Sequence, residues 1–247
     1  MIVMLLIKFE LPVYASEMQL PDIAVNIGGE SVSGQGGSAT LQMMFIITII
    51  ALAPSILIMM TSFLRIIISL HFVRSAIGTQ TMPPNQILVG LALFLTFFIM
   101  SPVFMEIKTS AMDPLDAGTI TQEQAIERGV QPLKEFMLRQ ARDEDVALFM
   151  DIADTPNFKD DEDFVKEMPL HVIVPAFIIS ELRAGFIIGF LVYIPFIIID
   201  MVVAATLMSM GMMMLPPAMI SLPFKLLLFI MVDGWNLFIG EMIGTFN

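Results

Sequence analysis

Met210 to Pro217 read MGMMMLPP, four methionines around one glycine and two closing prolines, and this stretch decides the fold. Strongly apolar sequence lies on both sides of it. A helix that only crosses lipid needs no such run, because Leu, Ile and Val meet that demand without a Pro-Pro break. The methionine side chain is unbranched and flexible, so it can fill a gap whose shape changes. We therefore predict a helical hairpin whose loop either lines a passage or fills the hairpin core.

The composition places the whole chain in the membrane class. Hydrophobic residues make up 57%, charged residues 15%, and the mean hydropathy is +0.84. The absence of cysteine excludes disulfides, thiolate nucleophiles and cysteine metal sites. A net charge of -12 argues against nucleic acid as a partner, since phosphate binding needs a basic surface.

Upstream of the Met-rich stretch, two more apolar segments predict a first hairpin. Leu41–Leu64 holds 24 residues without a charge, about 36 Å as a helix, which is enough to span a bilayer. The basic side chains of Arg65, His71 and Arg74 follow. Under the positive-inside rule they place this end of the span in the cytoplasm. A second span, Ile87–Met105, would then return the chain to the outside.

An acidic segment separates the two hairpins. Residues 106–167 contain 16 of the 24 acidic and 7 of the 12 basic residues. Apolar spacing predicts two amphipathic helices, one from Pro132 and one around Val146–Ala153. The aspartate runs lack the spacing of a calcium loop, so we predict no metal site.

These features divide the chain into five parts. The apolar start and the Val13-Tyr14-Ala15 stretch fit a secretory signal, and glycine and serine dominate residues 26–40. We predict a signal peptide over 1–15, a flexible linker over 16–40, the first apolar hairpin over 41–105, the acidic helical segment over 106–169, and the second hairpin with the Met-rich loop over 170–247.

Ionisable residues interrupt the apolar runs of the second hairpin. They are Glu181, Arg183, Asp200, Lys225, Asp233 and Glu241. Each ionised group would cost about 2.5 to 3.5 kcal/mol or more at a bilayer centre, so they cannot all face lipid. They either pair within a protein assembly or line water. We therefore predict an all-α protein of integral-membrane type, with about four long apolar segments in hairpins that pack against other subunits.

A buried Lys225 needs an acidic partner, and Glu181 is the predicted one. In the alternative, Lys225 extends to a headgroup and Glu181 pairs locally with Arg183. A structural role is expected for Arg183 and Asp200, and also for Asp233 and Trp235. Trp235 would anchor at an interface, beside a glycine that permits close backbone approach.

Catalytic motifs are absent from the sequence. It has no HExxH, GxSxG or phosphate-binding GxxxxGK[ST], and its two histidines lie in unrelated segments. An intramembrane pair of Asp200 and Asp233 is conceivable, but neither lies in a recognisable protease motif. We expect no enzyme, no catalytic residue and no cofactor.

The Met-rich turn has a counterpart upstream. Residues 78–84 read GTQTMPP and residues 211–217 read GMMMLPP, each between two apolar stretches. Glycine can end one helix and proline favours an extended break before the next. Gly211, Pro216 and Pro217 are therefore the predicted break of the second hairpin.

Several longer motifs resemble the FliP family of flagellar type III export-gate proteins. They are SMGMMMLPP (209–217), LPFKLLLFIMVDGWNL (222–237), PLKEFMLRQAR (132–142), SELRAGFIIGF (180–190) and MSPVF (100–104). The resemblance runs from about Leu41 onward. It implies a pore-forming subunit in the bacterial inner membrane, within the flagellar basal body, through which unfolded flagellar proteins pass.

The resemblance also implies partners and a pore seal. The partners are further copies of the chain, FliQ-like and FliR-like subunits, and FlhA-like and FlhB-like export components. Met212, Met213 and Met214, with Met210 adjacent, match the loop that seals the pore in that family. The hairpins would lie largely within a protein complex raised out of the bilayer, with the acidic segment at the periplasmic end.

Two other functions stay open at this stage. The injectisome counterpart of the family shares the hydrophobic motifs, but its members usually lack a signal and a long N-terminal tail, so residues 1–40 favour the flagellar branch. A secondary transporter would also show broken helices and intramembrane charges. It would work without a methionine constriction or an oligomer.

Overall fold

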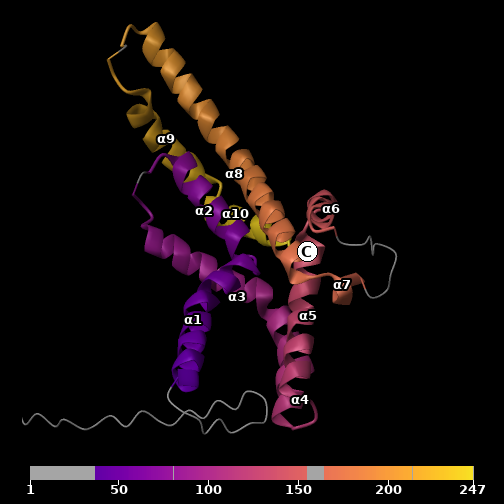
Figure 1. Cartoon of the computed structure of the whole chain (residues 1–247). Coiled ribbons are helices and arrows are strands. Elements are labelled where there is room, and N and C mark those ends of the chain that lie inside the picture. Colours follow the sequence, from indigo (N-terminus) through magenta and orange to yellow (C-terminus); the bar gives the residue numbers. More distant parts are fainter. Residues whose placement is uncertain (1–36, 80, 155–163, 213, 247) are drawn as a thin grey trace, which may run out of the picture. The chain divides into compact units, whose positions relative to one another are not determined.

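The computed structural model describes residues 37–79, 81–154, 164–212 and 214–246, and these residues form helices and no strand (Figure 1). The helices are α1 Gly37–Met59, α2 Phe63–Ile77, α3 Asn85–Ile107, the π-helical turn Lys108–Met112, α4 Asp113–Asp116, α5 Gln122–Gln140, α6 Asp143–Ile152, α7 Phe164–Glu167, α8 Leu170–Ser209, α9 Pro217–Met231 and α10 Gly234–Gly244. The all-helical prediction is confirmed. The predicted signal peptide and the linker up to residue 36 lie outside the described residues.

Two helical stretches in the described part of the chain are long and apolar enough to cross a membrane. They are Asn85–Asp116, which includes α3, and α8. The pair α9 and α10 qualifies as a third only if its 65° bend lies within one span. The structure thus has two to three membrane-length helices where four apolar segments were predicted.

The missing span is the first one, because the predicted segment Leu41–Leu64 is divided at residues 60–62 between α1 and α2. Helix α2 buries Ile66, Leu70 and Val73 completely, in a core shared with α8. This packing carries Arg65 into the protein interior instead of to the end of a span. The residues described from Ile49 onward form one packed unit, with a boundary after Thr48.

Small residues let α2 and α8 approach closely. A methyl group on Gly189 would lie 2.3 Å from Cδ2 of Phe72, and one on Gly185 would lie 3.1 Å from Cβ of Ile68. Glycines four residues apart form one small-residue stripe on a helix, the usual means of close helix packing among apolar helices. The SELRAGFIIGF motif therefore serves this contact.

The acidic segment contains two amphipathic helices, as predicted, but α5 begins ten residues before Pro132. Its start is a capping box: Gln124 N–H donates to Thr121 Oγ1 (3.3 Å), and Thr121 N–H donates to Gln124 Oε1 (3.1 Å). Pro132 lies inside the helix, which loses one backbone hydrogen bond there. The predicted start at Pro132 is therefore wrong, because the cap at Thr121 is the stronger signal.

Helix α8 holds the acidic segment against the apolar hairpins. Ser180 Oγ donates to Asp145 Oδ2 (2.6 Å) and accepts the backbone N–H of Arg142 (3.0 Å). Phe136 of α5 packs edge-on against Phe177 of α8, with ring centroids 6.0 Å apart. The first half of α8 is therefore the structural centre of the fold.

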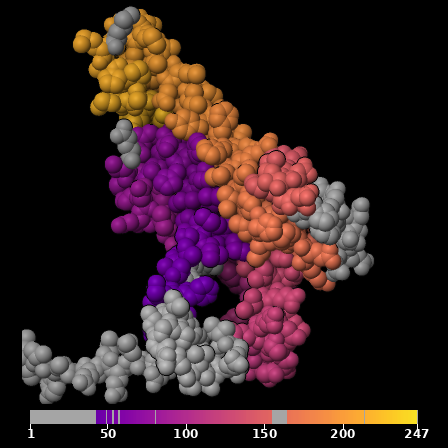
Figure 2. All heavy atoms as spheres, viewed as in Figure 1, coloured from indigo at the N-terminus to yellow at the C-terminus, as the bar shows by residue number. Residues whose placement is uncertain are grey.

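The second half of α8 is mostly exposed and leads to the Met-rich loop. At about 1.5 Å per residue the 40 residues of α8 measure about 60 Å. Beyond Gly189 only Phe196 and Leu207 are buried on this helix. Figure 2 shows the orange end of α8 and the start of α9 extending beyond α2, in purple. The Met-rich loop thus connects two helices at a projecting tip.

Candidate functional site: the Met-rich loop and the buried charge pairs

Gly211 ends α8 with a left-handed residue at φ 75°. Its N–H donates to the carbonyl of Met208 (3.1 Å), and Met212 N–H donates to the carbonyl of Leu207 (3.0 Å). These two bonds form a Schellman motif, which satisfies the last carbonyls of a helix. Gly211 is thus the predicted hairpin break, for a defined conformational reason.

The prolines complete the turn. Pro216 is extended at φ -65° and ψ 116°, and Pro217 is the first residue of α9, where its missing N–H costs nothing. Met210 is 69% exposed and Met214 98% exposed, while Met212 is half-buried. Met213 lies outside the described residues. Met210 and Met214 therefore do not fill the core of the hairpin within this chain.

The upstream turn has the same construction. Gly78 ends α2 at φ 87°, its N–H donates to Ser75 O (3.1 Å), and Pro84 is extended just before α3. A methyl group on Gly78 would lie 3.8 Å from Leu222 Cδ1 and 3.9 Å from Lys225 Nζ. The first turn therefore lies against α9, beside the charged residue of the second hairpin.

Arg74 lies one turn and His71 two turns before this glycine. Burial, and then the neighbouring Arg74 guanidinium, lower the pKa of His71 below its ordinary value. Arg74 Nη2 lies 2.9 Å from His71 Nδ1. A neutral ring can accept this hydrogen bond from the guanidinium, so the contact and the lowered pKa agree.

Lys225 pairs with Asp200. Its Nζ lies 2.6 Å from Asp200 Oδ2, and Ser221 Oγ donates to Asp200 Oδ1 at 2.5 Å. The Lys225 side chain is 5% exposed and that of Asp200 38% exposed. The prediction that Glu181 is the partner of Lys225 is therefore wrong. These contacts join α8 to α9 below the Met-rich loop.

Hairpin symmetry is the signal that would have found this pair. Asp200 lies 13 residues before Met213 and Lys225 lies 12 residues after it (213 − 200 and 225 − 213). Residues equidistant from the turn of a helical hairpin lie opposite each other when both arms are helical. A search for charges placed symmetrically about the loop would have selected Asp200.

Glu181 pairs with Arg65 of α2. Arg65 Nε donates to Glu181 Oε2 at 2.9 Å, and its Nη2 contacts Oε1. The two side chains are 5% and 0% exposed. Arg183, the alternative partner, points to the exposed side of α8. Sequence reasoning missed Arg65 because it treated this residue as the basic flank of a span.

The same guanidinium contacts two further parts of the chain. Arg65 Nη1 donates to Thr245 O (2.9 Å) and Thr245 Oγ1 (3.1 Å), and Nη2 donates to Gln140 Oε1 (3.0 Å). It also lies over the Phe246 ring, with Cζ 4.0 Å from the centroid. Arg65 therefore joins α2, α5, α8 and the residues after α10, and we call this set the Arg65 junction.

The VDGW stretch forms the bend between α9 and α10. Asp233 adopts a left-handed φ of 50°, and a methyl group on Gly234 would lie 2.4 Å from the Phe229 ring. Trp235 packs edge-on against Phe229, with centroids 5.3 Å apart. The carboxylate of Asp233 accepts from Asn236 (3.1 Å), so Asp200 and Asp233 have different partners. Within the described residues, no cluster of three His, Asp or Glu side chains could hold a metal.

Comparison with known proteins shows the family. A model described as the FliP family matches residues 46–242. "Flagellar biosynthetic protein FliP" of Bacillus subtilis (strain 168) is 53% identical over 209 residues, covering 85% of this chain and 93% of the relative. The FliP of Pectobacterium carotovorum subsp. carotovorum is 51% identical over 213 residues (86% and 81%). That of Agrobacterium fabrum (strain C58 / ATCC 33970) is 41% identical over 246 residues (100% and 98%). With this match over most of its length, the chain belongs to the FliP family.

Proposed function

We propose that this chain is a core subunit of the flagellar type III protein export gate in the bacterial inner membrane. Several copies would surround a path for unfolded flagellar proteins, and their Met-rich loops would close it. The observation that carries the proposal is a methionine loop at a projecting hairpin tip. The side chains of Met210 and Met214 are exposed there and free to contact other molecules.

The physical properties of the loop fit a deformable seal. A ring of thioether side chains from several copies would make a dry constriction, and such constrictions block ions. Their flexibility would allow the ring to widen around polypeptides of varied sequence. The Asp200–Lys225 pair supports this role, because it fixes the two arms about 15 Å below Met210.

Exposed apolar faces support assembly with other subunits. They include Phe94 and Phe97 on α3, Phe186, Phe190 and Met201 on α8, and Phe224, Leu227 and Met231 on α9. An apolar surface of this extent marks a lipid or protein contact. We assign it to further copies and to FliQ-like and FliR-like subunits, with FlhA-like and FlhB-like components nearby. The acidic segment would lie on the periplasmic side, and the chain would act as a conduit without enzymatic activity.

The test is ion conductance of the assembled complex. The parent, co-expressed with its FliQ-like and FliR-like partners, is compared with a variant carrying Ala at Met212, Met213 and Met214. A matched control replaces Met82, Met105 and Met112, three exposed methionines outside the loop. A leak restricted to the loop variant is expected. An intact assembly with unchanged conductance would refute the seal.

A further inference from the structure

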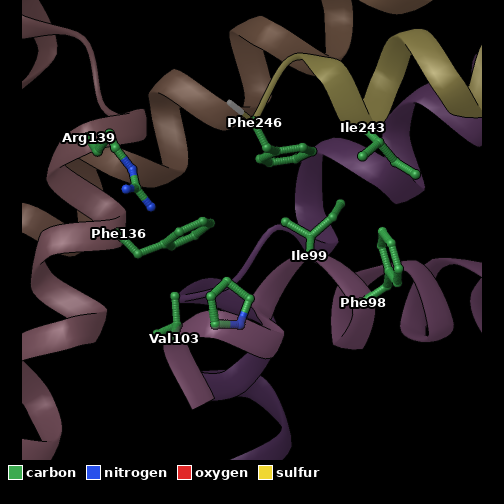
Figure 3. Close-up of a pocket in the computed structure, with 8 residues that line it drawn as sticks. Phe98, Ile99, Val103, Phe136, Arg139, Ile243 and Phe246 are labelled. Atoms are coloured by element: carbon green, nitrogen blue, oxygen red, sulfur yellow. The ribbon is translucent and has the colours of Figure 1, made fainter. Parts of the chain in front are cut away.

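A crevice opens between α3, α5 and the end of α10, beside Phe246. Its volume is about 340 Å³. The apolar side chains that line it are Phe98, Ile99, Pro102, Val103, Phe136, Ile243 and Phe246 (Figure 3). Ligand pockets span about 300 to 1,000 Å³, so this volume suits one slender apolar group instead of a large ligand.

One cation stands at the edge of this apolar lining. Figure 3 shows Arg139 of α5 reaching toward the space between Phe136 and Phe246. Arg139 is exposed and makes no hydrogen bond or ion pair to the part of the chain that is described. Among the described residues, no carboxylate lines the crevice. The lining therefore combines an apolar slot with one guanidinium available to an anion.

The crevice also lies where apolar helices meet the polar segment. Its walls come from α3 and α10, parts of the apolar stretches that are candidates for membrane spans. Its cation comes from α5, which belongs to the charged segment between them. A guanidinium beside an apolar crevice matches an anionic lipid, which joins a hydrocarbon chain to a negatively charged headgroup.

The wall formed by Phe246 is fixed independently of any ligand. Its ring stacks on the Arg65 guanidinium at 4.0 Å, and its carbonyl accepts from Gln140 Nε2 at 3.2 Å. The opposite wall is rigid helix, since Val103 and Phe136 are buried in the core. Because the walls of the crevice are already ordered, binding a ligand there costs little conformational entropy.

We propose that this crevice binds one acyl chain of an anionic phospholipid, with the lipid phosphate paired to Arg139. The apolar side chains hold the hydrocarbon and the guanidinium selects a negatively charged headgroup. The proposal concerns the outer surface of the subunit and does not depend on the Met-rich loop acting as a seal.

The test is native mass spectrometry of the full chain in detergent, with added phosphatidylglycerol or phosphatidylcholine. We expect one retained phosphatidylglycerol and roughly tenfold weaker retention in Arg139→Gln, as for the loss of one charge-assisted contact. Arg128→Gln is the matched control, because Arg128 is also exposed on α5 but lines no part of this crevice. Ile243→Trp should block the slot and reduce retention, with circular dichroism verifying the helical fold.

Three results would overturn the proposal. They are equal retention of both lipids, retention that is indifferent to Arg139, and retention lowered equally by the Arg128 control. A fourth result, loss of the lipid when FliQ-like and FliR-like partners co-purify, would also overturn it, because the crevice would then be a subunit contact.

Discussion

At the residue scale, the fold depends on how a few buried charges are neutralised. Arg65 makes five hydrogen bonds, as many as a guanidinium has N–H groups. Lysine could not replace Arg65, because an ammonium group has only three N–H donors and lacks the planar arrangement that binds both oxygens of a carboxylate. The sequence correctly indicated that Glu181 and Lys225 need partners. It could not identify Arg65, since 116 residues separate Arg65 from Glu181 and no local pattern links them.

Arg65→Leu should destabilise the chain strongly, because it leaves Glu181 buried without its counter-charge. Breaking a buried pair in this way typically costs about 3 to 5 kcal/mol. Thermal unfolding in detergent, followed by circular dichroism, measures the effect. Arg183→Leu is the control, since Arg183 is exposed on α8. Equal melting temperatures for the two variants would show that the junction adds no stability.

Asp200→Ala and Lys225→Ala should each loosen the arms of the second hairpin. Electron paramagnetic resonance would measure this with spin labels at positions 208 and 219, both exposed near the tip. The distribution of distances between the two labels should become broader. The double variant with Asp200→Leu and Lys225→Met should narrow the distance distribution again, because an apolar pair of similar volume can replace an ion pair. A distribution unchanged in the single variants would contradict a bracing role.

At the element scale, two Gly-to-Pro turns and one long helix organise the chain. The repeated Gly and Pro-Pro spacing correctly predicted both breaks, because a left-handed glycine and an extended proline are local requirements. The division of the first apolar segment was not predictable in this way. It depends on α2 packing against α8, which is more than 100 residues away in the sequence.

Gly189→Leu should separate α2 from α8, since even a methyl group would meet the Phe72 ring at 2.3 Å. Overpacking of this kind typically costs about 1 to 3 kcal/mol. Chemical denaturation in detergent would measure it. Gly240→Leu provides the matched control, because nothing in the described structure lies within 4 Å of a methyl group there. If both variants unfold at the same denaturant concentration, the close helix contact is unimportant.

At the scale of the whole molecule, α3, α8 and α9 expose more apolar surface than a soluble monomeric protein usually does. The composition predicted a membrane-type protein, and the long helices agree with it. Which face of α8 packs within the chain and which stays exposed could not be predicted from the sequence, because apolar residues surround most of this helix and mark no preferred side. The buried stripe on its first half became visible only once its neighbours were placed.

Single cysteines should map this surface cleanly, since the chain has no cysteine of its own. We expect Phe190→Cys and Phe224→Cys to react with maleimide in the isolated chain and to be protected after co-expression with the FliQ-like and FliR-like partners. Glu123→Cys, exposed in the acidic segment, should react in both states. Undiminished labelling of the two apolar positions in the complex would exclude these faces from assembly.

The Arg65 junction also has a consequence for the timing of biosynthesis. Arg65 and Thr245 are 180 residues apart in the sequence. At about 5 to 20 residues per second, the ribosome makes Thr245 roughly 10 to 40 s after Arg65. Helices form within microseconds, so α2 must wait with a charge whose later partners have not been synthesised. The junction is therefore among the last contacts to form, and a nascent chain stalled before Thr245 would keep its guanidinium only partly satisfied.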